Sequence, residues 1–319
     1  MKSVTGYILA ATFILSAACS RVPERNDGLK IAVLRGPSAV QAVRLIDSLS
    51  RNPEGRWSVS MYDEPLRLRT EMIDGAVDFA VLPTTMAALL YNKGVDYRLV
   101  AVPVWGSLYL CGTDSTCHDI RNLRGQRVNV MGRGTAPDVL FRHILDGNGL
   151  NPDRDLTLDY SFPAHVDLAN AAMAGRTRLC LLPEPFVSLA AAGGSGLTVL
   201  ADMAEEWRKL HGMPLAETSL LCRGNLSEAD TSAVRELLGA YLRSSEWVVS
   251  HPDSAAALAV GYGIAADSSA LCASIPRSRF NVIRAEDAEK EIDFYLEVFL
   301  NSYPDAIGNR MPDEKFIVR

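Results

Sequence analysis

An apolar segment near residue 80 recurs one hundred positions later, and this repeat constrains the fold most strongly. In both places a glycine precedes a short apolar run that ends in Leu-Pro, at 75–83 and at 175–183. Apolar runs at 29–34 and 127–131, each followed by a glycine loop, lie at a similar separation. Such runs alternate with helical patterns, which predicts βαβ units and a largely parallel sheet. The repeat therefore predicts two similar α/β lobes.

Length and composition agree with a two-lobe globular chain. The 319 residues suffice for two domains of ordinary size. With 48% apolar and 22% charged residues, the chain can bury a sizeable core. The net charge of −6 argues against nucleic-acid binding, which needs a basic face.

The N-terminus is typical of an exported bacterial protein. Residues 4–18 are mostly apolar, too few to span a bilayer comfortably, and they end in small residues before Cys19. This pattern resembles a lipobox, although Ser16 stands where an apolar residue is usual. We predict a signal peptide at 1–18, a lipidated Cys19 and a tether at 19–28. An extracytoplasmic, membrane-anchored lipoprotein follows; the alternatives are a cleaved signal without lipid and an uncleaved anchor.

An exported chain meets an oxidising compartment, so the cysteines matter. Beyond Cys19 the chain contains Cys111, Cys117, Cys180, Cys222 and Cys272. An odd number leaves at least one free thiol if every bond is intramolecular. The sequence allows a pairing of Cys111 with Cys117 or with Cys222, and it predicts that Cys180 and Cys272 are buried. No Cys/His spacing resembles a zinc site, so no metal is predicted.

Two segments near 107–113 and 218–224 have the pattern of crossings between the lobes. We therefore predict a first lobe of residues 29–112 and 222–319 and a second lobe of residues 113–221. Two crossings define a two-strand hinge. The chain is mostly helical after residue 227.

The order of several motifs resembles a known family. They are the lipobox, GPSA at 36–39, LPTT at 82–85, VNVM-GRGT at 128–135, LPEP at 182–185, HPDSAAALAVGYG at 251–263 and PDEKFI at 312–317. In this order they resemble the substrate-binding lipoproteins of nitrate/sulfonate/taurine-type ABC importers, which share a fold with thiamine-pyrimidine-precursor proteins. The resemblance covers about residues 29–316. It implies a type II periplasmic binding protein fold, a ligand in the interlobe cleft, and an ABC permease and ATPase as partners. The cysteine-rich iron motif of the pyrimidine-synthesising relatives is absent.

Four corners follow apolar strands and precede helices, where free backbone N–H groups and the helix dipole favour ligand binding. The candidate ligand-binding residues are Arg35, Gly36, Ser38, Thr84, Thr85, Trp105, Gly132, Arg133, Gly134, Thr135 and Glu184. The two arginines stand in equivalent loops and indicate an anionic group, whereas Glu184 indicates an amine or a ring N–H. Trp105 could stack on a planar ligand. Each kind of residue also has a structural alternative. The hydroxyl residues could cap helices, the glycines could serve only tight turns, and the arginines could be solvated surface residues. Glu184 could form a rim salt bridge, and Trp105 could pack in the core.

These features predict a binding protein rather than an enzyme. GxSxG, HExxH and the P-loop are absent, and no cofactor is expected. The predicted ligand is a small anionic or heterocyclic organic solute, with sulfonate, nitrate, carboxylate, pyrimidine and flavin left open, and the chain is predicted to act as a monomer. The alternatives are a sensor or adaptor lipoprotein that reports to a membrane receptor, and an enzyme on the same fold.

Overall fold

Two separate β-sheets organise the chain in the computed structural model, which describes residues 28–113 and 119–319. The first sheet has the order β11-β4-β10-β3-β1-β2. Its strands are β1 (Leu29–Leu34), β2 (Trp57–Tyr62), β3 (Phe79–Pro83), β4 (Tyr97–Val104), β10 (Thr218–Arg223) and β11 (Phe280–Arg284). The second sheet has the order β7-β6-β8-β5-β9. Its strands are β5 (Leu108–Gly112), β6 (Arg127–Asn129), β7 (Thr157–Asp159), β8 (Leu179–Pro183) and β9 (Thr198–Asp202).

The two sheets follow one plan, which confirms the two-lobe α/β prediction. In each, the first strand lies between the second and the third, and all three are parallel. An antiparallel strand then separates the third strand from the fourth: β10 in the first sheet and β5 in the second. Each of these antiparallel strands enters from the other lobe, so the chain crosses twice between the sheets.

The strand pairing places the two crossings a few residues before the segments predicted from the sequence. Strand β5, which the sequence analysis placed in the first lobe, pairs in the second sheet, and β10 pairs in the first. The crossings therefore lie at 105–107 and 212–217, just before the predicted segments. An apolar run such as 108–112 shows that a strand forms, but the run does not say which sheet it joins.

Helices cover both faces of each sheet. Those of the N-terminal part are α1 (Pro37–Gln41), α2 (Val43–Ser50), α3 (Pro65–Ile73) and α4 (Thr84–Asn92). Those of the second lobe are η1 (Ile120–Leu123), α5 (Ala136–Gly147), α6 (His165–Met173), α7 (Phe186–Ala192) and α8 (Met203–His211). The C-terminal part adds α9 (Gly224–Ala229), α10 (Thr231–Ser250), α11 (Pro252–Gly261), α12 (Ser268–Ser274), η2 (Ile275–Arg277), η3 (Ala285–Ala288), α13 (Glu289–Ser302), η4 (Pro304–Ile307) and η5 (Glu314–Phe316).

The central strands β1 and β3 of the first sheet are almost entirely apolar because both of their faces are covered. Side chains alternate across a strand, so Ile31 and Val33 pack in one apolar cluster while Ala32 packs in another. The same alternation separates Phe79 from Ala80. This two-sided burial explains the near-continuous apolar runs of the sequence.

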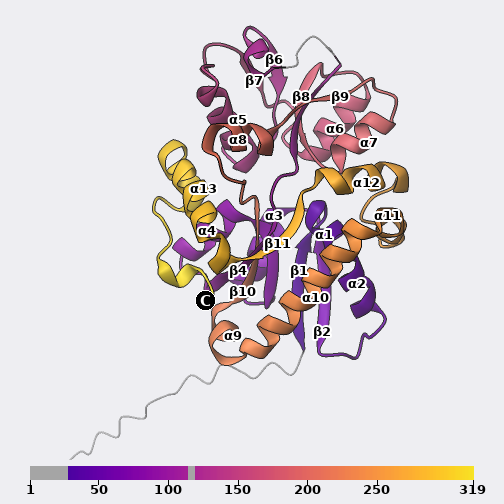
Figure 1. Ribbon diagram of the computed structural model, residues 1–319, viewed down its shortest axis with the longest axis vertical. Helices are drawn as coiled ribbons and strands as arrows, with labels where there is room; N and C mark the ends of the chain where they lie inside the picture. Colours follow the sequence, from indigo (N-terminus) through magenta and orange to yellow (C-terminus); the bar gives the residue numbers. More distant parts are fainter. Residues whose placement is uncertain (1–27, 114–118) are drawn as a thin grey trace, which may run out of the picture.

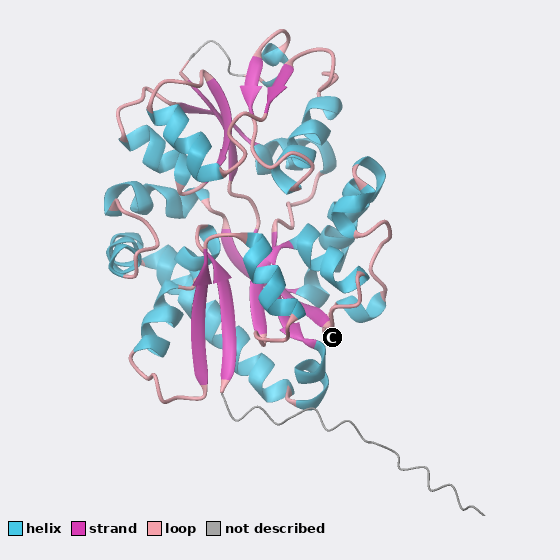
Figure 2. Ribbon diagram, turned by 180° about the vertical axis from the view of Figure 1, so that it is seen from behind, coloured by secondary structure: helices cyan, strands magenta, loops and turns pink. Residues whose placement is uncertain are grey.

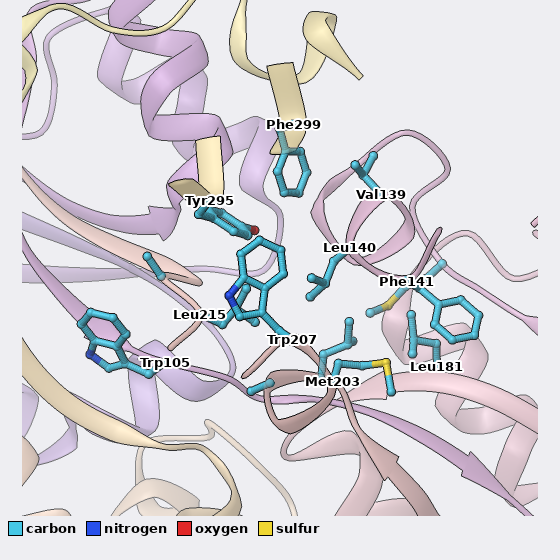
Figure 3. Packing of buried hydrophobic residues seen from close by; sticks show 14 of the residues in the cluster. Trp105, Val139, Leu140, Phe141, Leu181, Met203, Trp207, Leu215, Tyr295 and Phe299 are labelled. Carbon is cyan, nitrogen blue, oxygen red and sulfur yellow. The ribbon is translucent and has the colours of Figure 1, made fainter. Parts of the chain in front are cut away.

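One apolar cluster continues from the first lobe into the second. It joins Leu82 of the first sheet to Leu181 of the second. Trp207 of α8 belongs to the same cluster, and its ring centroid is 5.8 Å from that of Tyr295 on α13 (Figure 3). Helix α13 packs on α4 in the first lobe and on α5 in the second, so it bridges the lobes (Figure 1).

Some predictions fall outside the described part of the chain. The signal peptide, Cys19, the tether up to residue 27 and Cys117 all lie there. Within residues 28–113 and 119–319, no helix combines the length and the apolarity needed to cross a membrane.

Candidate functional site

Four strand-to-helix corners lie where the sequence predicts them. They connect β1 to α1 at 35–36, β3 to α4 at 83–84, β6 to α5 at 130–135 and β8 to α7 at 184–185. Carboxyl ends of parallel strands share one edge of a sheet, so each lobe presents two corners on one side. Strand β1 runs from the outer end of the first lobe towards the second lobe (Figures 1 and 2).

Contacts between distant segments place three of these corners at the junction of the lobes. In the second lobe, Glu184 donates its backbone N–H to the Ser107 carbonyl in the first crossing, at 2.8 Å. In the first lobe, Thr84 donates its backbone N–H to the Glu217 carbonyl in the second crossing, at 3.1 Å. The Gly134 loop lies against Tyr303, which follows α13. Both lobes therefore direct their corners towards the segments that join them.

The Pro83–Thr85 corner presents buried hydroxyl groups. Thr84 is fully buried, and its Oγ1 accepts a hydrogen bond from Ser219 Oγ at 3.0 Å. Helix α4 begins at Thr84 with no side-chain cap, so the threonines do not act as helix caps. Thr218, which is adjacent to Pro83 across the ladder, is 8% exposed, and its Oγ1 finds no hydrogen-bond partner among the described residues. The sequence analysis missed Thr218 because only strand pairing brings it to this corner.

The equivalent corner of the second lobe presents a carboxylate instead. Glu184 is fully buried and accepts hydrogen bonds from Ser188 N–H and Ser188 Oγ at 3.1 and 3.0 Å. Arg277 Nη1 lies 3.5 Å from Glu184 Oε1. Burial raises the pKa of Glu184, against the opposing effect of these partners. Glu184 is therefore an interior charge with a partner from the C-terminal segment rather than a rim salt bridge.

The first glycine corner is built on a backbone conformation that only glycine adopts readily. Gly36 has φ 134° and ψ −149° and precedes Pro37, the first residue of α1. Ser38 is buried, and its carbonyl accepts a hydrogen bond from the Tyr241 hydroxyl at 3.3 Å. The helix begins at Pro37, before Ser38, so this serine does not cap it and the structural alternative of a helix cap is excluded for Ser38.

The second glycine corner is a tight turn closed by its own residues. Gly132 and Gly134 have φ of 59° and 76°, which favours glycine. Thr135 Oγ1 donates to the Gly132 carbonyl at 2.5 Å, and Gly134 N–H donates to Asp138 Oδ2 at 2.8 Å. These bonds leave the exposed Thr135 side chain oriented by the turn.

Solved structures show which fold this is. No family model matches the sequence, and no curated protein shows significant similarity to it. An ABC transporter from Parabacteroides distasonis superposes with a TM-score of 0.80 at 27% identity, over 92% of this chain and 99% of that one. The chain has the fold of the periplasmic substrate-binding proteins.

More distant structures agree with this assignment of the fold. The periplasmic aliphatic sulphonate binding protein SsuA from Escherichia coli has a TM-score of 0.73 at 17% identity, over 92% of each chain. The periplasmic nitrate-binding protein NrtA from Synechocystis PCC 6803 has a TM-score of 0.63 at 11% identity, over 88% of this chain and 84% of its own. The type II binding-protein architecture predicted from the motif order is confirmed.

In this binding-protein fold the two candidate arginines have partners within their own lobes. Arg35 Nε lies 2.6 Å from Asp63 Oδ1, and Arg35 also donates to the Gly263 carbonyl. The Arg133 guanidinium stacks over the Tyr160 ring, 5.2 Å from its centroid. An anion clamp made by both arginines stays a prediction.

Trp105, the first residue of the first crossing, is part of the core. It is 6% exposed, and its Nε1 donates to the Asn281 carbonyl at 2.7 Å (Figure 3). This placement corresponds to the structural alternative, and stacking on a ligand stays a prediction.

Hydrogen bonds that the sequence analysis missed tie the two crossings together. Ser107 N–H and Ser107 Oγ donate to the Glu217 carboxylate at 2.7 and 2.5 Å. Arg279 Nη2 pairs with Asp202 Oδ2 at 2.5 Å beside them. Burial raises the pKa of Glu217. These partners lie far apart in sequence, so no local pattern marks them.

The described residues do not suggest a metal centre. Within residues 28–113 and 119–319, no group of three or more His, Cys, Asp or Glu side chains could hold a metal ion.

Proposed function

We propose that this chain is the extracytoplasmic substrate-binding component of an ABC importer. It captures a small anionic or heterocyclic organic solute between its lobes and delivers it to a membrane permease and ATPase. The likeness to an ABC transporter over almost the whole of both chains supports this function. The observation that supports the proposal is that the Leu-Pro corner of each lobe is hydrogen-bonded to a crossing, Thr84 to Glu217 and Glu184 to Ser107.

Binding energies explain why a ligand needs both lobes. One helix terminus contributes about 0.3–1 kcal/mol to anion binding, and one charge-assisted hydrogen bond about 1.5–3 kcal/mol. Micromolar affinity needs about 8 kcal/mol. Several corners must act together, so contacts that exist only when the lobes close would shift the population towards the closed form.

The corners offer complementary groups for such a ligand. In the first lobe these are Thr85 and Thr218, which are both largely buried. In the second lobe they are Arg133, Gly134 and Thr135 on the exposed turn. Buried hydroxyl groups fix the orientation of a bound group, and the turn closes over it.

Lipidation of Cys19 would hold the protein, as a monomer, at a membrane surface. Each buried methylene of an acyl chain contributes about 0.8 kcal/mol, and two or more chains make anchoring stable. A short tether would then keep the lobes near the permease.

Native mass spectrometry of the gently purified protein tests the function. We expect a small mass that is lost on denaturation. We also expect thermal shifts with members of a panel of sulfonates, nitrate, carboxylates, pyrimidines and flavins. The variant Thr85→Val should weaken the binding of the positive compound at least tenfold, whereas Thr70→Val, on the surface of α3, should not. A bare mass together with no shift across the panel would refute the proposal.

A further inference from the structure

Two arginines of the C-terminal segment reach carboxylates of the second lobe. They belong to residues 275–279, which connect α12 to β11 of the first sheet. Arg277 Nη1 lies 3.5 Å from Glu184 Oε1, just after β8. Arg279 Nη2 lies 2.5 Å from Asp202 Oδ2, at the end of β9. Helix α12 itself packs on α7 of the second lobe (Figure 1), so this segment brings cations of the first lobe to the second-lobe corner.

The two arginines differ in how completely their charges are matched. The Arg279 pair is a close contact, whereas 3.5 Å exceeds the ordinary hydrogen-bond length of about 2.7–3.2 Å. Glu184 is fully buried and already accepts two hydrogen bonds from Ser188. The Arg277 side chain is 44% exposed, and among the described residues it makes no other ion pair. A guanidinium has five N–H donors, so most of those of Arg277 are available to a ligand.

Contacts from the first crossing and from β5 hold the backbone of this segment in place. The Tyr109 hydroxyl donates to the Arg277 carbonyl at 2.6 Å, and Trp105 N–H donates to the Arg279 carbonyl at 3.2 Å. Arg279 has a φ of 45°, in the left-handed region that side chains other than glycine seldom adopt. A guanidinium on a fixed backbone loses less freedom when it binds a ligand, which favours affinity.

A buried hydroxyl without a partner belongs to the same junction. Thr218 is 8% exposed, and its Oγ1 has no hydrogen-bond partner among the described residues. The preceding residue, Glu217, accepts a hydrogen bond from Ser107 Oγ, and the Ser107 carbonyl accepts one from Glu184 N–H. Buried hydroxyl groups ordinarily have a partner. Thr218 is therefore a second polar group that a ligand at the junction can satisfy.

We propose that Arg277 binds an oxyanion group of the ligand, such as a carboxylate or a sulfonate. The proposal rests on the proposed function and narrows its ligand to an anionic one. The planar guanidinium matches such a group with two parallel hydrogen bonds. Glu184 is the positioning residue, since its carboxylate is buried and orients Arg277 from behind. Arg35 and Arg133, which the sequence singled out, have partners within their own lobes.

Binding titrations of the purified protein with methanesulfonate, acetate, nitrate and uncharged uracil test this assignment. We expect Arg277→Gln to weaken the binding of every anionic compound that binds by at least tenfold, because a charge-assisted contact is lost. Arg277→Lys, which keeps the charge but not the paired donors, should weaken it less. The matched control is Arg284→Gln in the same segment, where Arg284 pairs with Glu286, and it should bind like the unaltered protein.

Native mass spectrometry adds a test with the ligand that the protein itself retains. We expect the retained molecule to carry an acidic group and to be lost from Arg277→Gln, while thermal unfolding shows that this variant is folded. A retained molecule without an acidic group, or unchanged anion binding by Arg277→Gln, would overturn this assignment and leave the proposed function standing. No retained mass and no response to any compound would refute the proposed function and this assignment with it.

Discussion

The Leu-Pro corners of the two lobes share a backbone plan but differ in chemistry. Leu82 and Leu182 are both buried at the ends of their strands, and a proline follows each. The next residue is Thr84 in the first lobe and Glu184 in the second. The threonine accepts a hydrogen bond from Ser219 of the neighbouring strand, whereas the glutamate accepts hydrogen bonds from Ser188 of the helix that follows it and pairs with Arg277.

This difference shows how a duplicated plan can serve two tasks. Burial requires the leucine and the strand, so both lobes keep them. The residue after the proline faces the junction, where its partners come from other segments, and it is therefore free to differ. A neutral hydroxyl binds without a large desolvation cost, but a buried carboxylate needs several donors.

Removing the Glu184 carboxylate should lower the free energy of unfolding more than any other substitution considered at the corners. We expect Glu184→Ala to lower the free energy of unfolding by about 3 kcal/mol, because Ser188 and Arg277 lose their partner. Urea unfolding measures the loss. Glu184→Gln, which keeps the shape and an acceptor, serves as the control and should lose less. A smaller effect for Glu184→Ala than for Thr84→Ala would contradict this interpretation of the corner.

The glycine corners allow the same comparison for the backbone. Gly36→Ala should cost about 2 kcal/mol because its φ and ψ lie in a region that is almost exclusive to glycine, although nothing lies within 4 Å of an added Cβ. Gly132→Ala should cost about 1 kcal/mol, because its φ of 59° is left-handed and tolerated by other residues. Chemical unfolding of both variants tests the order, and the reverse order would show that crowding by Thr135 outweighs backbone strain.

Removing only the hydroxyl should affect the first corner mildly. Thr84→Val keeps the shape but removes the acceptor for Ser219, so we expect a loss of about 1 kcal/mol. A double-mutant cycle with Ser219→Ala isolates this interaction. A coupling free energy near zero would show that the Ser219–Thr84 hydrogen bond is not the source of the loss.

A histidine pair should make the second lobe the acid-sensitive one. His143 Nε2 lies 2.9 Å from His211 Nε2, and the His211 ring packs against Phe294 of α13. Burial lowers the pKa of both histidines, and for His143 the neighbouring His211 adds to this. The unfolded chain then binds more protons below about pH 6.5, so stability present above that pH is lost as the pH falls.

Thermal unfolding at pH 7.5 and 5.5 measures this small effect. We expect the midpoint to fall on acidification, and to fall less in His211→Phe, which keeps an aromatic ring against Phe294. His251→Phe in the first lobe is the matched control. Its midpoint should fall on acidification by as much as that of the unaltered protein. If the midpoint of His211→Phe falls on acidification as much as that of the unaltered protein, the histidine pair is not the cause of the acid sensitivity.

Much of the fold could be predicted because it rests on local and periodic properties. Apolar runs, glycine loops and the repeat at 75–83 and 175–183 are direct consequences of strand burial and turn conformation. The order of motifs predicted the binding-protein fold. The corners could be placed because a strand that ends before a helix leaves its backbone groups available at a known edge of the sheet.

The contact partners of the site residues could not be predicted. Side chains that meet at the lobe junction come from segments about 90 to 135 residues apart in the sequence. Arg277 beside Glu184, Glu217 beside Ser107 and Thr218 beside Pro83 all depend on the crossings and on strand register. The same is true of Cys180 opposite Cys111. The sequence by itself therefore determined the lobes and the positions of their corners, since burial and turn geometry are local. Only the tertiary structure decided which charges, hydroxyl groups and thiols meet, since pairing across a sheet and between lobes leaves no local trace.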